Sequence, residues 1–302
     1  MLTYIAFYII ILLLVPIFDV ILKNIKNTLN GKKRLPLLQT YYNLIKLFKK
    51  DNSRSQFTST ISIIAPIIIL TVSIIFLFLI PIVSKGININ IIVLFHLLWL
   101  SSLFLIIYAL DNATYFGWLW ASREIFVLAI SEPIVILIIL WFSIISWGNF
   151  NIVEIHNLLS NNINVITSLF IFFLWIALFV IILAENKRFP FDNPATHLEL
   201  TMIHEAMLLE TNWTTLAILE IASKITLIAF VNLFIYFIWT NSYWLTNNIF
   251  LFWLYLLKVL IILWCIALIE VFITKIRVFK YQNIFWFLLI ILVIMSIFYF
   301  LN

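Results

Sequence analysis

The side chains best suited to chemistry are gathered in one polar stretch, residues 185–210, of an otherwise mostly apolar chain. It holds five of the thirteen acidic residues and two of the four histidines: Glu185, Asp192, Glu199, Glu205, Glu210, His197 and His204. Carboxylates and imidazoles whose pKa is tuned by their surroundings are the groups that a proton relay needs. Because the spacing of the two histidines matches no zinc motif, the sequence predicts no metal site.

Prolines divide this stretch into two parts. Pro190 and Pro194 lack an amide proton and favour an extended residue before them, so 186–195 is predicted to be a loop. A capping box that begins at Thr196 predicts a helix over 197–210. An interfacial helix with a solvated polar face would explain the same pattern, and the residues alone leave both interpretations open.

Further ionisable side chains fall inside apolar runs. Glu220 and Lys224 are one helical turn apart and are predicted to pair. Glu132 precedes Pro133 in the middle of an apolar run and has no obvious local partner. An ionisable group in hydrocarbon costs several kcal/mol unless it is paired or hydrated, so such residues usually face a bundle interior or a water path. A pair that merely holds helices together is the alternative for Glu220 and Lys224.

Other charged residues mark the ends of the apolar runs. Arg123 and Glu124 lie where one run ends and the next begins. Glu270 stands near the end of another run, close in sequence to Lys275 and Arg277, and is predicted to form an interfacial salt bridge with them.

The composition is that of a polytopic membrane protein, because 65% of the residues are hydrophobic and 10% are charged, against roughly a quarter charged in soluble domains. The apolar runs are continuous and do not alternate, which excludes a spanning β-barrel. We therefore expect one all-α integral membrane domain over 1–302, with about eight transmembrane helices and amphipathic helices in its cytoplasmic loops. The expected spans are 3–22, 60–83, 88–110, 124–147, 164–184, 214–240, 248–273 and 281–301, with a polar loop over 185–213.

The loops predict an orientation. If the N-terminus is outside, the inner loops carry fifteen Lys and Arg residues and the outer loops carry one. This positive-inside bias predicts that both termini face outward and that 185–213 faces the cytoplasm. It also explains the net charge of +5 without a nucleic-acid partner. The basic stretch 23–54 has apolar residues at helical spacing, which predicts a helix on the membrane surface, and the Asn-rich residues 148–163 are expected to form a loop.

The polar stretch carries a family resemblance. The runs RFPFDNP (188–194) and THLELTMIHEAMLLE (196–210) resemble the signature of the membrane-anchor subunit of energy-converting group 4 [NiFe] hydrogenases and formate hydrogenlyases. That family is related to NADH dehydrogenase subunit 1 of respiratory complex I. Shorter segments around 116–133 and 37–50 agree with it. Trp118 departs from the pattern, because a second glycine is usual near Gly117.

The resemblance implies a non-catalytic membrane subunit that docks a redox arm on its cytoplasmic face, in the inner membrane. Its expected partners are hydrophilic iron–sulfur and [NiFe] hydrogenase-type subunits, antiporter-like membrane subunits and the lipid bilayer. The partners would hold the iron–sulfur clusters and the [NiFe] centre, and the single cysteine, Cys265, independently excludes a cysteine-ligated cluster carried by this chain alone. The expected docking residues are Arg188, Asp192, His197, His204, Arg123 and Glu124. The expected relay of H⁺ or Na⁺ comprises Glu132, Glu199, Glu205, Glu210, Glu220 and Lys224.

Three alternatives stay open from the sequence. The first is the quinone-binding subunit of a respiratory NADH dehydrogenase, which shares the same architecture. The second is a stand-alone ion or solute transporter, against which the lack of broken-helix glycine signals argues mildly. The third is a passive membrane anchor, whose acids could all be neutralised without loss of coupling.

Overall fold

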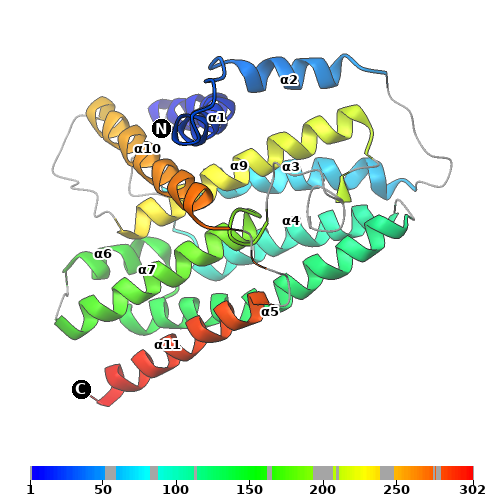
Figure 1. Cartoon of the computed structure of the whole chain (residues 1–302). Helices are drawn as coiled ribbons and strands as arrows, with labels where there is room; N and C mark the ends of the chain where they lie inside the picture. Colours follow the sequence, from blue (N-terminus) through cyan, green and yellow to red (C-terminus); the bar gives the residue numbers. More distant parts are fainter. Residues whose placement is uncertain are drawn as a thin grey trace.

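The computed structural model of the chain describes residues 2–51, 59–81, 88–111, 114–161, 165–192, 207–208, 211–238, 248–274, 276 and 280–301. Within these ranges every extended regular element is a helix, which confirms the predicted all-α class. The helices are α1 (Leu2–Leu29), α2 (Gln39–Phe48), α3 (Ile61–Leu79), α4 (Ile91–Asp111), α5 (Tyr115–Ile145), α6 (Ile152–Asn161), α7 (Val165–Glu185), α9 (Trp213–Ile238), α10 (Asn248–Phe272) and α11 (Tyr281–Leu301), as labelled in Figure 1.

Seven of the described helices are long and apolar enough to cross a membrane: α1, α3, α4, α5, α9, α10 and α11. A shorter apolar segment, Leu169–Glu185, belongs to α7 and brings the total near the expected eight. A helix suits such segments because it satisfies all its backbone hydrogen bonds internally in a medium without water. The first helix continues past the predicted residue 22 to Leu29, and Lys23 and Lys26 in its added turns bind carboxylates inside the protein.

The central helix of the bundle is α9. It packs against α1, α2, α3, α6, α7 and α10, and 67% of its apolar window is buried, against 44% or less in the other spans. Around it, α3 packs on α4, α1 packs on α10, and α11 contacts both α5 and α7 (Figure 1). Because α9 is enclosed by protein, the polar side chains on it must find their partners inside the bundle.

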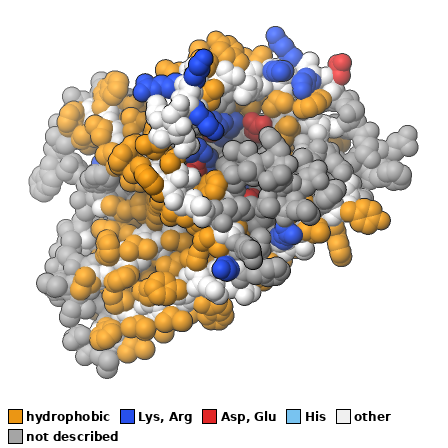
Figure 2. All heavy atoms as spheres, in the orientation of Figure 1, with side chains coloured by type: hydrophobic (Ala, Val, Ile, Leu, Met, Phe, Trp, Pro, Cys, Tyr) orange, Lys and Arg blue, Asp and Glu red, His pale blue; other side chains and the backbone are white. Residues whose placement is uncertain are grey.

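The surface separates into a basic part and an apolar part. Figure 2 shows Lys and Arg side chains gathered near the top, where Figure 1 places α2, and hydrophobic side chains over the lower left, where Figure 1 draws α7 and α11. Both chain ends lie at the left in Figure 1. Which side of the membrane the termini face stays a prediction.

The helix predicted within the basic stretch 23–54 is present as α2. It turns Thr40 and Leu44 into the protein, while Ile45 and Phe48 are about half exposed. Its outward apolar face is the one expected to contact lipid or another chain.

The prediction of a loop over 148–163 is wrong, because the structure forms helix α6 within this range. Ile152, Ile155 and Leu159 are buried on one side of this helix, at spacings of three and four residues that match the helical repeat. The asparagines between these apolar residues led to the loop prediction, although three well-spaced apolar side chains suffice to hold the helix against the bundle.

The corner between α4 and α5 requires a glycine. Thr114 caps α5 by accepting a hydrogen bond from the Gly117 amide at 3.1 Å. A Cβ on Gly117 would lie 2.6 Å from the carbonyl oxygen of Ala109 in α4, which is too close for a side chain. This approach of α4 to the first turn of α5 sets the position of Arg123 and Glu124, two turns further along α5.

Candidate functional site

A cavity of about 670 Å³ lies between α1, α3, α4, α9 and the loop that follows α7. Leu98 and Ser102, from the middle of α4, line it together with Ile69 of α3, so the cavity reaches into the depth of the spans. Nine ionisable side chains line it: Asp19, Lys23, Lys26, Glu185, Lys187, Arg188, Asp192, Glu220 and Lys224. Five basic and four acidic side chains around one cavity that reaches between the spans are unusual in a membrane protein and mark a functional site.

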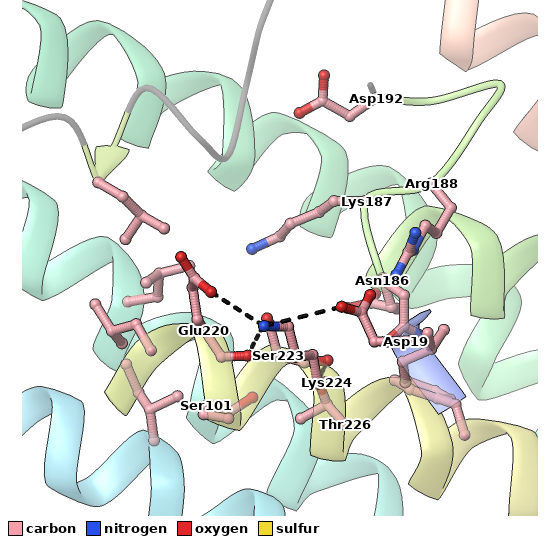
Figure 3. A pocket seen from close by; sticks show the side chains of 18 of the residues that line it. Asp19, Ser101, Asn186, Lys187, Arg188, Asp192, Glu220, Ser223, Lys224 and Thr226 are labelled. Carbon is pink, nitrogen blue, oxygen red and sulfur yellow. Dashed lines mark hydrogen bonds and ion pairs between the residues drawn. The ribbon is translucent and has the colours of Figure 1, made fainter. Parts of the chain in front are cut away.

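Lys224 of α9 stands between two carboxylates in this cavity (Figure 3). Its Nζ donates a hydrogen bond to Glu220 at 3.0 Å, which confirms the pair predicted from their spacing of four residues. The same Nζ lies 4.0 Å from Asp19 of α1. Asp19 is buried and also accepts from Lys23 at 2.7 Å and from Thr40 of α2 at 3.1 Å. One charged cluster thus joins α1, α2 and α9.

A second charged cluster is centred on Glu270, whose side chain is buried near the end of α10. It forms ion pairs with Lys26 of α1 at 2.5 Å and with Arg188 at 3.3 Å. Its predicted partners, Lys275 and Arg277, lie outside the described residues, and the described partners come from two distant segments. The described ion pairs of Glu270 are interior ones that fasten the polar loop to α1 and α10, and the predicted contact with Lys275 and Arg277 stays a prediction.

A third set of contacts ties α5 to the end of α7. Glu124 is buried and pairs with Lys187 at 2.9 Å, and Glu185 accepts a hydrogen bond from Ser131 at 3.1 Å. Arg123 lies over the ring of Trp120, with 4.1 Å between its guanidinium carbon and the ring centroid. The expected docking residue Glu124 therefore contacts the polar loop, and Arg123 precedes it on α5.

The polar loop itself is well packed. Arg188 and the buried Asp192 both line the cavity, and the Asp192 amide donates to the Arg188 carbonyl at 3.2 Å. Phe191 is buried against the rings of Tyr281 and Phe285 on α11. These contacts hold one side of the loop against the bundle and turn its charges towards the cavity.

Glu132 stands apart from these clusters. Its side chain is exposed on α5, next to the buried Ser131, and it is not among the cavity-lining residues. The structure thus places Glu132 on the outside of this chain while Glu220 and Lys224 face the inside. Its expected relay role stays a prediction.

The remaining predicted site residues lie outside the described part of the chain: His197, Glu199, His204, Glu205 and Glu210. Of the predicted helix 197–210, the structure describes Met207 and Leu208, which are both buried, and Leu208 lines the cavity. This end of the segment is thereby placed at the cavity wall.

Four of the nine ionisable cavity residues were not singled out by the sequence analysis: Asp19, Lys23, Lys26 and Lys187. Asp19 is the only acid in a long apolar first span, and an isolated intramembrane acid is by itself a signal of a functional site. Lys26 was assigned to a surface loop because the first helix was expected to end at 22. No local pattern in the sequence indicates that it meets Glu270.

Comparisons with known proteins identify the family and the fold of the chain. A model of the NADH dehydrogenase family matches residues 5–301. The fold is similar to a chain of the membrane-bound sulfane sulfur reductase, an archaeal respiratory membrane complex, with a TM-score of 0.84. That alignment covers 98% of this chain and 99% of the other at 18% sequence identity, so it establishes a common fold. A comparison with curated protein sequences finds no match.

Proposed function

This chain belongs to the NADH dehydrogenase family, and we propose that it is the membrane subunit of a multi-subunit redox complex that couples electron transfer to ion translocation. The observation that carries the proposal is the cavity with nine ionisable side chains, which lies beside the polar loop and extends between the spans. A passive anchor has no need for so many charges at this depth, since each costs free energy to bury.

The complex that we favour is an energy-converting hydrogenase or formate hydrogenlyase. The runs 188–194 and 196–210 support this choice, because they resemble the hydrogenase branch of the family. In such a complex, hydrophilic subunits dock on the polar loop and hold the iron–sulfur clusters and the [NiFe] centre. This chain supplies the membrane side of the interface, and we assign the cavity to the cytoplasmic side because the basic loops surround it.

Lys224 is the switching element of the proposed coupling. At an effective dielectric constant of 20, a unit-charge pair 4 Å apart gains about 4 kcal/mol, so the attraction of Lys224 to Asp19 is comparable to its attraction to the half-exposed Glu220. Protonation of Glu220 weakens one of these attractions and shifts Lys224 towards Asp19. A charge change at Glu220 can therefore move a cation inside the bundle.

The outward position of Glu132 supports a membrane-embedded partner. A carboxylate that faces lipid in the middle of a span is costly, and its exposed neighbours Ile125 and Ile136 form an apolar face around it. We propose that an antiporter-like subunit covers this face of α5 and presents a basic or hydrated group to Glu132. At Glu132, the proposed ion relay would pass from this chain to the antiporter-like subunit.

A quinone-binding subunit is the second candidate function. The size of the cavity favours it, because small-molecule sites commonly enclose 300–1,000 Å³ and the cavity combines an apolar deep end with a polar rim. Quinone reduction by the purified complex would support this candidate, and a complex that turns over hydrogen without reducing quinone would exclude it.

The direct test is to tag this chain in its native host and purify it from mildly solubilised membranes. We expect iron–sulfur and [NiFe]-type subunits to co-purify and hydrogen turnover in sealed vesicles to drive H⁺ or Na⁺ uptake. A chain that purifies alone and transports ions or solutes in proteoliposomes would contradict the proposal and support a stand-alone transporter.

A further inference from the structure

The turn that joins α1 to α2 presents three consecutive cations to solvent. Lys32, Lys33 and Arg34 are all exposed, and none of them forms an ion pair with another described residue. The sequence over 30–60 holds seven Lys and Arg residues against one acid, Asp51. Figure 2 shows Lys and Arg side chains gathered where Figure 1 draws α2. We call Lys32, Lys33 and Arg34 the basic corner.

The backbone holds the basic corner in a fixed turn. Gly31 has a φ of 67°, and the Lys32 amide donates to the Asn27 carbonyl at 2.7 Å, as in helix ends closed by a left-handed glycine. The side chain of Asn24 bonds both backbone groups of Leu35, with its Nδ2 donating at 2.9 Å and its Oδ1 accepting at 2.7 Å. Because the turn is already ordered, gathering its cations around a ligand costs little further entropy.

Helix α2 continues from this turn with an exposed apolar face. Four large side chains of α2 and its N-terminal flank are about half exposed: Leu38, Tyr42, Ile45 and Phe48. Their intervals of three and four residues place them on one face. Lys46 and Lys49 are exposed and lie beside this face, each four residues beyond one of its members. A lysine in such a position can lay its stem along acyl chains and keep its ammonium at the level of lipid phosphates.

The opposite side of α2 is fastened to the bundle. Thr40 is buried and donates to Asp19 at 3.1 Å. At the other end of the helix, the Nζ of Lys50 lies 3.3 Å from the ring centroid of Trp213 on α9. Asn43 lines the charged cavity. Helix α2 is therefore part of the cavity wall, and its apolar face is the outer side of that wall.

We propose that the basic corner and the apolar face of α2 bind an anionic phospholipid, with its phosphate at the corner and its acyl chains along the face. Charge complementarity selects this occupant, because a cation close to an anionic lipid surface strengthens binding about fivefold. An amphipathic helix flanked by Lys and Arg combines this attraction with the burial of apolar area in the membrane. The proposal does not rest on the coupling function, since it needs neither a redox partner nor ion movement.

Lipid binding to the intact complex tests the proposal. The complex is delipidated in mild detergent and titrated with phosphatidylglycerol, or with phosphatidylcholine of the same acyl chains, and native mass spectrometry gives the apparent Kd of the tightest bound lipid. The combined changes Lys32→Gln, Lys33→Gln and Arg34→Gln are expected to weaken phosphatidylglycerol binding at least about tenfold, because three cations are lost. Binding of phosphatidylcholine should stay unchanged.

Two controls separate charge from other effects. The combined changes Lys32→Arg, Lys33→Arg and Arg34→Lys keep the three charges and should retain the wild-type Kd for phosphatidylglycerol. Ile45→Gln puts a polar side chain in the apolar face and should weaken the binding of both lipids. Glycerol phosphate, which carries the phosphate without acyl chains, should compete poorly with phosphatidylglycerol.

Three results would overturn the proposal. The first is an equal Kd for phosphatidylglycerol in the glutamine variant and the wild type. The second is displacement of phosphatidylglycerol by glycerol phosphate at equal concentration, which would indicate a site for free phosphate. The third is loss of hydrophilic subunits from the glutamine variant with unchanged lipid binding, which would assign the basic corner to a protein interface. The lipid titration involves no electron transfer, so its failure leaves the coupling function untouched.

Discussion

Glu270 offers a quantitative test of how the polar loop is held. Its buried carboxylate lies 2.5 Å from Lys26 and 3.3 Å from Arg188, and these two cations have no other ion pair among the described residues. Glu270→Gln keeps the size of the side chain but removes its charge. The two cations would then face each other beside a neutral amide, with their side chains only 19% and 12% exposed.

The expected cost follows from the burial of this cluster. Removing one partner of a buried ion pair typically destabilises a protein by about 3–5 kcal/mol. Lys26 and Arg188 retain some access to water through the cavity, so we expect the lower end, about 3 kcal/mol, or a roughly 100-fold change in the folding equilibrium. The polar loop loses one of its fastenings, so retention of hydrophilic subunits should fall as well.

The assay is unfolding of the purified chain in mixed micelles with increasing denaturing detergent, combined with the yield of assembled complex. Glu154→Gln is the matched control, because Glu154 is an exposed acid on α6 and its loss should cost no more than about 0.5 kcal/mol. If Glu270→Gln is as stable as Glu154→Gln and assembles with the same yield, the interior ion-pair cluster is refuted. Lys26→Met combined with Glu270→Gln should cost less than the sum of the two single changes, because both remove the same interaction.

Three further outcomes are expected. Gly117→Val should lower the free energy of unfolding by about 1–3 kcal/mol, because its Cβ would overlap the Ala109 carbonyl; wild-type stability in detergent unfolding would exclude the tight corner. Thr40→Val should cost about 1.5 kcal/mol through the lost hydrogen bond to the Asp19 carboxylate, and an unchanged unfolding midpoint would argue against that bond. Burial lowers the pKa of His156 below its value of about 6.5 in the unfolded chain, so the His156 contribution to the free energy of unfolding is complete above about pH 6.5 and is lost as the pH decreases. His156→Gln should therefore flatten the curve of unfolding free energy against pH in this range. Equal slopes for the variant and the wild type would show that His156 is not buried in its neutral form.

The sequence predicted what depends on local spacing. Continuous apolar runs gave the helical class, and the interval of four residues gave the Glu220–Lys224 pair. The motif at 188–210 led to the correct family, since the family model covers 5–301. In each case the deciding interaction lies within a few turns of one helix or within one short segment.

The contacts that depend on long-range packing could not be predicted from the sequence. The ion pairs of Glu270 with Lys26 and Arg188 were not predicted, because these residues meet it only when α1 and the polar loop fold onto α10. Asp19 reaches Lys224 in the same way, across the contact of α1 with α9. Spacing along the chain carries no record of such contacts, so the cavity could be recognised only once the helices were placed.

The central claim is that the cavity couples redox turnover to ion movement, and the ratio of ions translocated to hydrogen turned over tests it most directly. This ratio should be measured in sealed vesicles for the wild-type complex, Lys224→Met and the control Glu154→Gln. We predict that Lys224→Met keeps substantial hydrogen turnover but loses most of the ion uptake per hydrogen, while the control keeps the wild-type ratio. A wild-type ratio in Lys224→Met would contradict the account.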